Sequence, residues 1–416
     1  MKLVRFRNPF GPSDAADPAL FSGRVAEMTA IARMLSAAYH SDPAQHLLVL
    51  GERGIGKTSL LRQCERMATD DLPGERTDFD FLVVSITLTG VTDMFDITQR
   101  TADGLRRALD RGKVGNPGLR QVVDFLLNWE ILGVHYHRPA GAATHDQALS
   151  TLVDKIVEVE RTGLFQGLFL SIDEADAPGA EVGLGPWCKD LCERLGQAGG
   201  RKTALALAGR SLLRNRLREG HGASLRLFDE LELTVLSPDE RRDIIDKGIR
   251  LANLSNDTPV TIAPKARDLI ADLSEGYPYF LQTFAHAALE AAAGGGEITL
   301  EHVVTSASQA TRDIGRKFFD GVFQEAATTE NYRMVLYAMA DAGNSWMTRK
   351  EITAAAAPDV SPDNVSNALR KMKHTDALDI DPDRPGVYRL PTRAFASWLT
   401  LMREDAIADA SAGGQD

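Results

Sequence analysis

The chain has 416 residues, well beyond the ~150 residues of a typical single domain, and this length predicts two or three domains. Hydrophobic residues make up 44% of the chain and charged residues 25%, a composition that excludes a disordered protein and allows a sizeable core. The formal net charge of −11 excludes a protein that is basic throughout, so any contact with nucleic acid must come from a local patch.

The compartment is predicted from the cysteines and the apolar runs. Three cysteines do not make a disulfide framework, and they favour a reducing environment. The first residues lack the apolar stretch of a signal peptide, and no apolar run reaches the ~18–20 residues that span a bilayer. We therefore expect a cytoplasmic protein that makes no membrane contact.

Short apolar runs alternate with helical patterns over roughly the first 240 residues. Such alternation predicts an α/β fold with a parallel sheet that helices cover on both faces. The five expected strands are 46–50, 81–88, 167–173, 203–209 and 231–236. Between the second and third strands lies a long helical stretch, 93–162, whose apolar residues either pack on the sheet or form a surface for a partner protein. These apolar residues are Val122, Phe125, Leu126, Trp129, Ile131 and Leu132.

Helical patterns dominate after the fifth expected strand. Residues 237–240 read Ser-Pro-Asp-Glu, a capping box that begins a helix, and 237–330 is expected to be a helical lid and linker without strands. In 331–406, three helices and two short strands around a Pro/Gly turn predict a winged helix-turn-helix. Caps at Thr348 and Ser361 begin the second and third of these helices. A polar tail, 407–416, follows.

Residues 51–58 read Gly-Glu-Arg-Gly-Ile-Gly-Lys-Thr and match G-x-x-x-x-G-K-[ST] between an expected strand and an expected helix. Glycines let backbone N–H groups surround phosphates, Lys57 reaches the β- and γ-phosphates, and Thr58 ligates Mg²⁺. The pattern therefore predicts a phosphate loop (P-loop) for ATP with Mg²⁺, and it places 1–236 in a P-loop sheet domain. The residues predicted to bind the nucleotide here are Gly51, Glu52, Arg53, Gly54, Ile55, Gly56, Lys57, Thr58 and Ser59.

The apolar strand 167–173 ends in Asp173 and is followed by Glu174. In this class of sheet such a strand end lies beside the phosphate loop. Asp173 would hold Mg²⁺, and Glu174 would orient and deprotonate the attacking water, which predicts hydrolysis as well as binding. An acidic pair on the surface is the alternative.

At this point the chain resembles the AAA+/STAND-type P-loop ATPases, and within them the prokaryotic ATPases that are similar to archaeal origin-recognition initiators. The resemblance covers nearly the whole chain. It rests on 51–58, on LFLSIDEAD at 168–176, on LALAGR at 205–210, on FSGR at 21–24 and on Gly-Tyr-Pro at 276–278. The segment GVYRLPTRAFASWL is similar to the end of the family's winged helix.

The resemblance implies further site residues. Phe21, Gly23 and Arg24 would line the adenine pocket, and Tyr277 and Pro278 would contribute to it from the lid, with Pro278 packed against the base. Nucleotide would then lie between the sheet domain and the lid. Many AAA+ motors carry an arginine in the lid just after a glycine, and this chain does not, which favours a switch between ATP and ADP states over a continuous motor.

The resemblance also implies catalytic roles for two arginines. Arg210 directly follows the fourth expected strand, where relatives keep an arginine that senses the γ-phosphate. Arg226 shortly precedes the fifth expected strand, where AAA+ relatives often place a finger that acts on a neighbouring subunit of an ATP-dependent homo-oligomer. For both residues a solvated surface arginine is the alternative.

The winged-helix segment carries candidate contacts to duplex DNA. Its third expected helix holds Arg370, Lys371 and Lys373, and its wing holds Arg384 and Arg389. Between 331 and 405, however, ten basic residues face ten acidic residues, so the segment is electrically balanced. DNA binding, protein docking and a purely structural role therefore all stay open.

The leading hypothesis is an ATP-binding, slowly hydrolysing molecular switch whose nucleotide state controls the engagement of DNA or of a partner protein. The alternative is a regulatory scaffold or loader ATPase that does not bind DNA and serves an effector protein, such as a nuclease of a prokaryotic antiviral defence or mobile-element system. That alternative rests on how relatives of the resembled family are deployed.

Overall fold

The computed structural model describes residues 6–12, 18–42, 46–72, 76–112, 145–220, 224–292 and 296–412. The chain divides into two compact units. One runs from Gly23 to Thr234, and the other joins the residues up to Ser22 with those from Val235 onward. Within the described ranges no helix is both long and apolar enough to cross a membrane.

The first unit is built on a parallel sheet of five strands in the order β2-β3-β4-β1-β5, which confirms the predicted fold class. Its central strands are buried along nearly their whole length because their residues are almost all apolar. The strands are β1 (His46–Leu50), β2 (Phe81–Thr87), β3 (Gly167–Asp173), β4 (Thr203–Gly209) and β5 (Phe228–Glu232).

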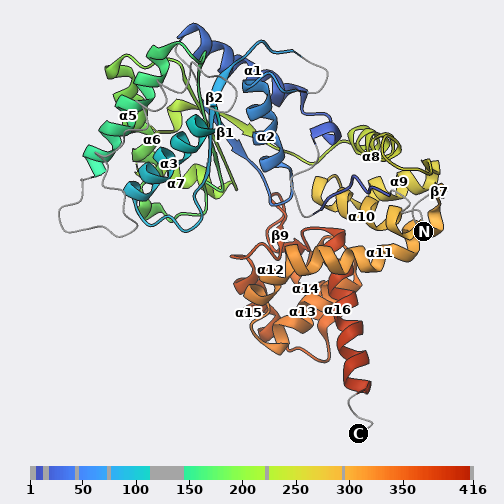
Figure 1. Cartoon of the computed structure of the whole chain (residues 1–416). Helices are drawn as coiled ribbons and strands as arrows, with labels where there is room; N and C mark the ends of the chain where they lie inside the picture. The colour runs from blue at the N-terminus through green and yellow to red at the C-terminus, as the bar shows by residue number, and fades with distance from the viewer. Residues whose placement is uncertain are drawn as a thin grey trace. The chain divides into compact units, whose positions relative to one another are not determined.

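Helices cover both faces of this sheet. Figure 1 shows α1 and α2 on one side of the strands and α3, α5 and α6 on the other, in agreement with the packing of α2 on β3 and of α3 on β2. These helices are α1 (Val25–His40), α2 (Lys57–Ala68), α3 (Met94–Gly112), α5 (His145–Thr162), α6 (Leu184–Ala198) and α7 (Leu212–Gly220). Short 3-10 turns are η3 (Ala180–Val182) and η4 (Ser224–Leu227).

The fifth strand differs from the prediction. The expected segment was 231–236, whereas β5 ends at Glu232. β5 is an edge strand that pairs with β1 alone, and β1 ends at Leu50, so no partner remains beyond that point. The N–H of Leu233 donates the last bond to the carbonyl of Leu50 at 2.8 Å. The apolar residue Leu236 contributes instead to the core of the second unit.

The long helical stretch predicted for 93–162 contains α3 and α5. Residues 113–144 lie outside the described ranges, and with them the apolar segment from Val122 to Leu132. The prediction of a partner surface there therefore stays a prediction.

The second unit begins with a helical lid. Its elements are η1 (Pro18–Leu20), α8 (Pro238–Asn253), β6 (Val260–Ile262), α9 (Pro264–Leu273), α10 (Pro278–Ala291), β7 (Gly296–Ile298) and α11 (Leu300–Ile314). The capping box at the start of α8 is confirmed, because Ser237 and Glu240 exchange backbone and side-chain hydrogen bonds. The expectation of a lid without strands is wrong. β6 and β7 pair in parallel, and their runs of three residues are too short to stand out as strands in the sequence.

The N-terminal segment packs into this lid. The Phe10 side chain is buried, and a Cβ atom on Gly248 of α8 would overlap its ring. Asn8 donates to the carbonyl of His286 at 3.1 Å, and Leu20 is buried in the same core. The segment therefore belongs to the lid although more than 200 residues separate the two along the chain.

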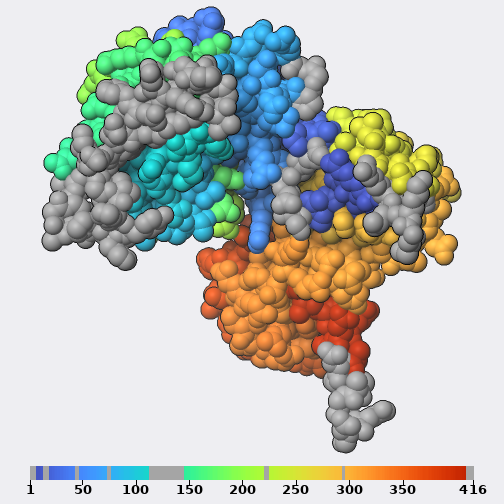
Figure 2. Space-filling view, in the orientation of Figure 1, coloured from blue at the N-terminus to red at the C-terminus, as the bar shows by residue number. Residues whose placement is uncertain are grey.

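The remainder of the second unit has the predicted winged-helix elements. A π-helical turn, η5 (Gly315–Phe319), continues α11 and leads into α12 (Asp320–Ala326). The following elements are α13 (Glu330–Asp341), β8 (Met347–Thr348), α14 (Arg349–Ala356), α15 (Pro362–Met372), β9 (Asp379–Ile380), β10 (Val387–Arg389) and α16 (Arg393–Ala412). The predicted caps at Thr348 and Ser361 are present. In Figure 2 these elements form one continuous orange-to-red body.

Candidate nucleotide site

The phosphate loop joins β1 to α2. It includes Gly54 with φ 73° and Gly56 with φ 101°, values at which residues with a Cβ atom are strained. Gly56 is the N-cap of α2, and no side chain caps this helix end. The N–H groups of the first turn are thus presented at the loop together with the positive end of the helix dipole, an arrangement that suits a phosphate anion.

Lys57 lies against the loop that precedes it. Its Nζ donates to the carbonyl oxygens of Gly51 and Glu52, each at 2.8 Å. Burial lowers the pKa of the ammonium, and the negative charges of Asp176 and Asp173 oppose that shift. The cation therefore lies among acceptors that phosphate oxygens could replace.

The two predicted Mg²⁺ ligands meet beside the loop. Thr58 is in the first turn of α2 and Asp173 ends β3, and the Thr58 hydroxyl donates to the Asp173 carboxylate at 2.6 Å. Hydroxyl and carboxylate oxygens are hard donors of the kind that Mg²⁺ prefers. The residues present at this point therefore fit a magnesium ion.

Glu174 follows Asp173 in a left-handed backbone conformation with φ 50°. Its N–H donates to Asp173 Oδ1 at 2.8 Å, and its own carboxylate accepts a hydrogen bond from the Thr89 hydroxyl. Thr89 was not among the predicted site residues. The available signal was its position just after β2, since the carboxyl ends of parallel strands meet at one edge of the sheet.

A second ion pair borders the loop. Arg210, directly after β4, donates through Nε to Asp176 Oδ2 at 2.8 Å. Burial alone would raise the pKa of Asp176, but hydrogen bonds from Arg210 outweigh it and lower that pKa. Both residues act electrostatically on Lys57, so the pair lies beside the loop. Asp176 was also missed, although it closes the acidic run that begins at Asp173.

Other predicted site residues are in parts of the chain outside the phosphate loop. Phe21, Tyr277 and Pro278 belong to the second unit. Tyr277 is the N-cap of α10, where Pro278 is the first residue, and its ring lies 5.0 Å from that of Phe280. Arg226 is exposed in η4. The roles predicted for these residues, including the adenine pocket, stay predictions.

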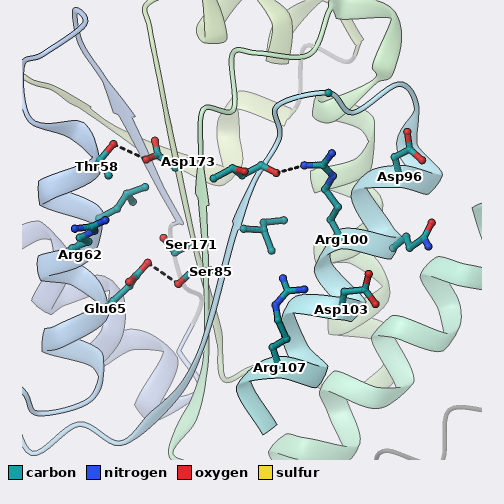
Figure 3. Close-up of a pocket in the computed structure, with 15 residues that line it drawn as sticks. Thr58, Arg62, Glu65, Ser85, Asp96, Arg100, Asp103, Arg107, Ser171 and Asp173 are labelled. Carbon is teal, nitrogen blue, oxygen red and sulfur yellow. Dashed lines mark hydrogen bonds between the residues drawn. The ribbon is translucent and has the colours of Figure 1, made fainter. Parts of the chain in front are cut away.

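A polar groove of about 730 Å³ extends from Thr58 and Asp173 along the edge of the sheet. Figure 3 shows side chains of α2 on one side and side chains of α3 on the other. Arg100 donates to the carbonyl of Thr87 at 3.0 Å. The labelled charged residues that line it are Arg62, Glu65, Asp96, Arg100, Asp103 and Arg107. Basic and acidic groups therefore alternate along the groove.

The basic residues of the winged helix fall into two groups. Arg370, Lys371 and Lys373 are exposed on α15 or at its C-terminal end. The two wing arginines are in ion pairs: Arg384 Nε donates to Asp381 at 2.7 Å, and Arg389 Nε donates to Asp379 at 3.0 Å. The basic side chains of α15 are therefore exposed to solvent, whereas the wing arginines are paired with acidic residues of the wing.

The order of the sheet, the phosphate loop and the C-terminal winged helix together define the AAA+ P-loop ATPase fold of the Cdc6/ORC type. Among solved structures, the chain is similar to Aeropyrum pernix ORC2 in its ADPNP-ADP complexes, with TM-score 0.59, 16% identity, and 97% and 99% of the two chains covered. It is also similar to Cdc6p from Pyrobaculum aerophilum, with TM-score 0.50, 14% identity and the same coverage.

A Walker-type ATPase from Pyrococcus abyssi matches with TM-score 0.54 and 15% identity over 91% of this chain and 96% of that chain. At such identities the shared property is the fold, and at that level the resemblance seen in the sequence is confirmed; its STAND part stays a prediction. No protein-family model matches the sequence, and no curated protein matches it.

Proposed function

We propose that this protein binds ATP with Mg²⁺, hydrolyses it slowly, and uses its nucleotide state as a switch. The observation that carries the proposal is the 2.6 Å hydrogen bond between Thr58 and Asp173, which brings both expected metal ligands to the phosphate loop. The fold, shared with Aeropyrum pernix ORC2 in its ADPNP-ADP complexes, supports it.

Each residue has a separate part in this proposal. The N–H groups of the loop and the Lys57 ammonium bind the phosphates, and Thr58 and Asp173 hold Mg²⁺. The ion, when bound, neutralises charge on the β- and γ-phosphate oxygens. Glu174 orients the attacking water and accepts its proton, for which its carboxylate must be shared with or released by Thr89. Arg210, held by Asp176, supplies positive charge at the γ-phosphate.

In this proposal the nucleotide state controls the engagement of DNA or of a partner protein through the second unit. The lid and the winged helix pack into one core, and the carboxylate of Glu275 in the lid accepts the N–H groups of Arg393 and Ala394 at the start of α16, at 3.0 and 2.9 Å. Glu275 immediately precedes 276–278, the lid residues expected near the nucleotide. A displacement of the lid would therefore carry the winged helix with it.

Duplex DNA is the second part of the proposal. The observation in its favour is the exposure of Arg370, Lys371 and Lys373 at the end of α15, where none of the three forms an ion pair within the described part of the chain. A loader or scaffold role without DNA is the competing output, and it rests on the same nucleotide site.

The nucleotide proposal is tested by measuring ATP affinity and steady-state turnover. We expect Glu174→Gln to leave the Kd for ATP within about threefold and to lower turnover by about 100-fold or more, because only proton transfer from water is lost. Lys57→Ala should abolish binding. Glu219→Gln, an exposed carboxylate on α7, is the matched control. Unchanged turnover in Glu174→Gln would remove Glu174 as the base, and tight ATP binding by Lys57→Ala would overturn the site.

A further inference from the structure

The chain crosses between its two compact units twice. The first crossing lies between Ser22 and Gly23, and the second lies between Thr234 and Val235. At the first crossing, Gly23 and Arg24 are both left-handed, with φ of 71° and 58°. The value at Gly23 is ordinary for glycine, but a long side chain at positive φ is uncommon and persists where its surroundings hold it in place.

The Arg24 side chain makes the contacts that hold it there. Its Nη2 donates to the carbonyl of Thr234 at 2.6 Å and to the carbonyl of Ile55 at 3.4 Å. Its Nη1 pairs with Glu27 at 3.3 Å, and 9% of the side chain is exposed. One guanidinium therefore joins both crossings to each other and to the phosphate loop.

The second crossing also touches the loop directly. Leu233 donates to the carbonyl of Leu50, the residue before the loop, at 2.8 Å. A Cβ atom on Gly51 would lie 2.8 Å from Ile55 and 3.2 Å from Leu233, so the first residue of the loop has no room for a side chain. The loop therefore packs closely against Leu233, and Arg24 donates hydrogen bonds to both Ile55 and the neighbouring Thr234.

We propose that Arg24 is a positioning residue that transmits the state of the phosphate loop to both crossings, and so sets the placement of the lid-bearing unit. This inference rests on the proposed function and deepens it by naming the device that regulates the switch. A guanidinium presents several N–H donors in a fixed plane and can serve three acceptors at once, which a lysine ammonium on a flexible stem does not reproduce.

The test measures the distance between the units as nucleotide is added. Fluorescence donor and acceptor dyes are attached at Gln197→Cys and Ser308→Cys, both exposed. Cys64 and Cys188 are buried, and burial raises the pKa of Cys192 to about 12, so the native thiols react poorly. Transfer efficiency is recorded without nucleotide, with ADP and with a non-hydrolysable ATP analogue, and nucleotide affinity and melting temperature are measured on the same samples.

We expect the labelled protein with Arg24 intact to change its transfer efficiency with nucleotide. Measured at nucleotide concentrations that saturate each variant, Arg24→Ala and Arg24→Lys should lose at least about half of that change. Glu27→Gln is the control, because it removes the ion pair and leaves both carbonyl contacts of Arg24; it should keep the change. A residue with only a structural role would lower the melting temperature and leave the nucleotide response intact.

The outcomes separate the two proposals. If the nucleotide-dependent change in transfer efficiency is as large in Arg24→Lys as in the protein with Arg24, the role of Arg24 is overturned. Arg24→Lys provides this test even if Arg24→Ala does not fold. If the labelled protein with Arg24 intact binds nucleotide without any change in transfer efficiency, the coupling is overturned while ATP binding stays in place. Absence of nucleotide binding would overturn both.

Discussion

At the residue scale, the site is a set of polar groups that hydrogen-bond to one another. Lys57 is fixed by two loop carbonyls, Thr58 by Asp173, Glu174 by Thr89, and Arg210 by Asp176. Each of these contacts includes at least one group to which the proposed function assigns a part in nucleotide, metal or water binding.

His46 begins β1 in the interior of the first unit. Burial lowers its pKa from 6.5 to about 4, and its Nδ1 has no hydrogen-bond partner among the described residues. Its Nε2 lies 3.2 Å from the Cys192 sulfur. The imidazole is therefore neutral in the folded protein at pH 7, and charging it would place an uncompensated cation in the core.

We predict that this histidine destabilises the protein on acidification. Because the pKa is lower when folded, the unfolded chain binds a proton from pH 6.5 downward while the native state binds one only near pH 4. Stability is unaffected at pH 7.5 and falls by up to about 3 kcal/mol across that window. Urea unfolding of the original protein and of His46→Leu between pH 7.5 and 4.5 measures this. Parallel pH profiles would contradict it.

At the scale of elements, the start of α16 is stabilised both by the preceding residue, because the Thr392 hydroxyl accepts the N–H of Phe395 at 3.0 Å, and from the lid. Glu275, itself left-handed with φ 50°, accepts the first two N–H groups of α16. Arg393 then donates to the carboxylate and the carbonyl of Asp272 at 3.1 and 2.7 Å. On the neighbouring turn a Cβ atom at Gly315 would overlap the Trp398 ring, so η5 and α16 pack with no space between them.

Glu275→Ala should therefore destabilise the first turn of α16. The loss of a cap that satisfies two backbone donors is expected to lower the opening free energy of the first turn of α16 by about 1–2 kcal/mol. Hydrogen exchange of the amides of 393–396 measures this value. Glu325→Ala, an exposed carboxylate on α12, is the control. Equal exchange rates in both variants would show that the cap is not needed.

At the scale of the whole molecule, the net charge is −11, but the charged residues are unevenly distributed. The winged-helix segment is balanced, yet its acids pair with the wing arginines while Arg370 and Lys371 stay exposed at the end of α15. A local cationic surface can therefore exist on a segment whose net charge is zero. Composition alone does not reveal this separation.

We predict that Arg370→Ala with Lys371→Ala weakens duplex DNA binding in every nucleotide state and lowers the slope of log affinity against log salt by about 1 per lost phosphate contact. Arg384→Ala, already paired with Asp381, should change binding much less. Fluorescence anisotropy with labelled duplex DNA at several salt concentrations, with ATP, ADP or neither, provides the measurement. Failure to bind DNA in all states would favour the scaffold role.

The sequence by itself determined the phosphate loop, four of the five sheet strands to within a residue, and the caps at Ser237, Thr348 and Ser361. These features depend on residues that are neighbours along the chain, so their patterns are visible without a structure. The sequence also pointed to Asp173 and Glu174, because a buried strand that ends in acids is itself a local signal.

Only the tertiary structure decided which distant residues meet. The end of β5 depends on the length of β1, the place of the N-terminal segment depends on a gap above Gly248, and the Asp176–Arg210 pair depends on two neighbouring strands. Arg24 is the clearest case. In the sequence it belonged to a motif expected near adenine, whereas its contacts reach 31 residues to Ile55 and 210 residues to Thr234. Such contacts leave no periodic pattern, because they are fixed by the packing of the chain and not by its local conformation.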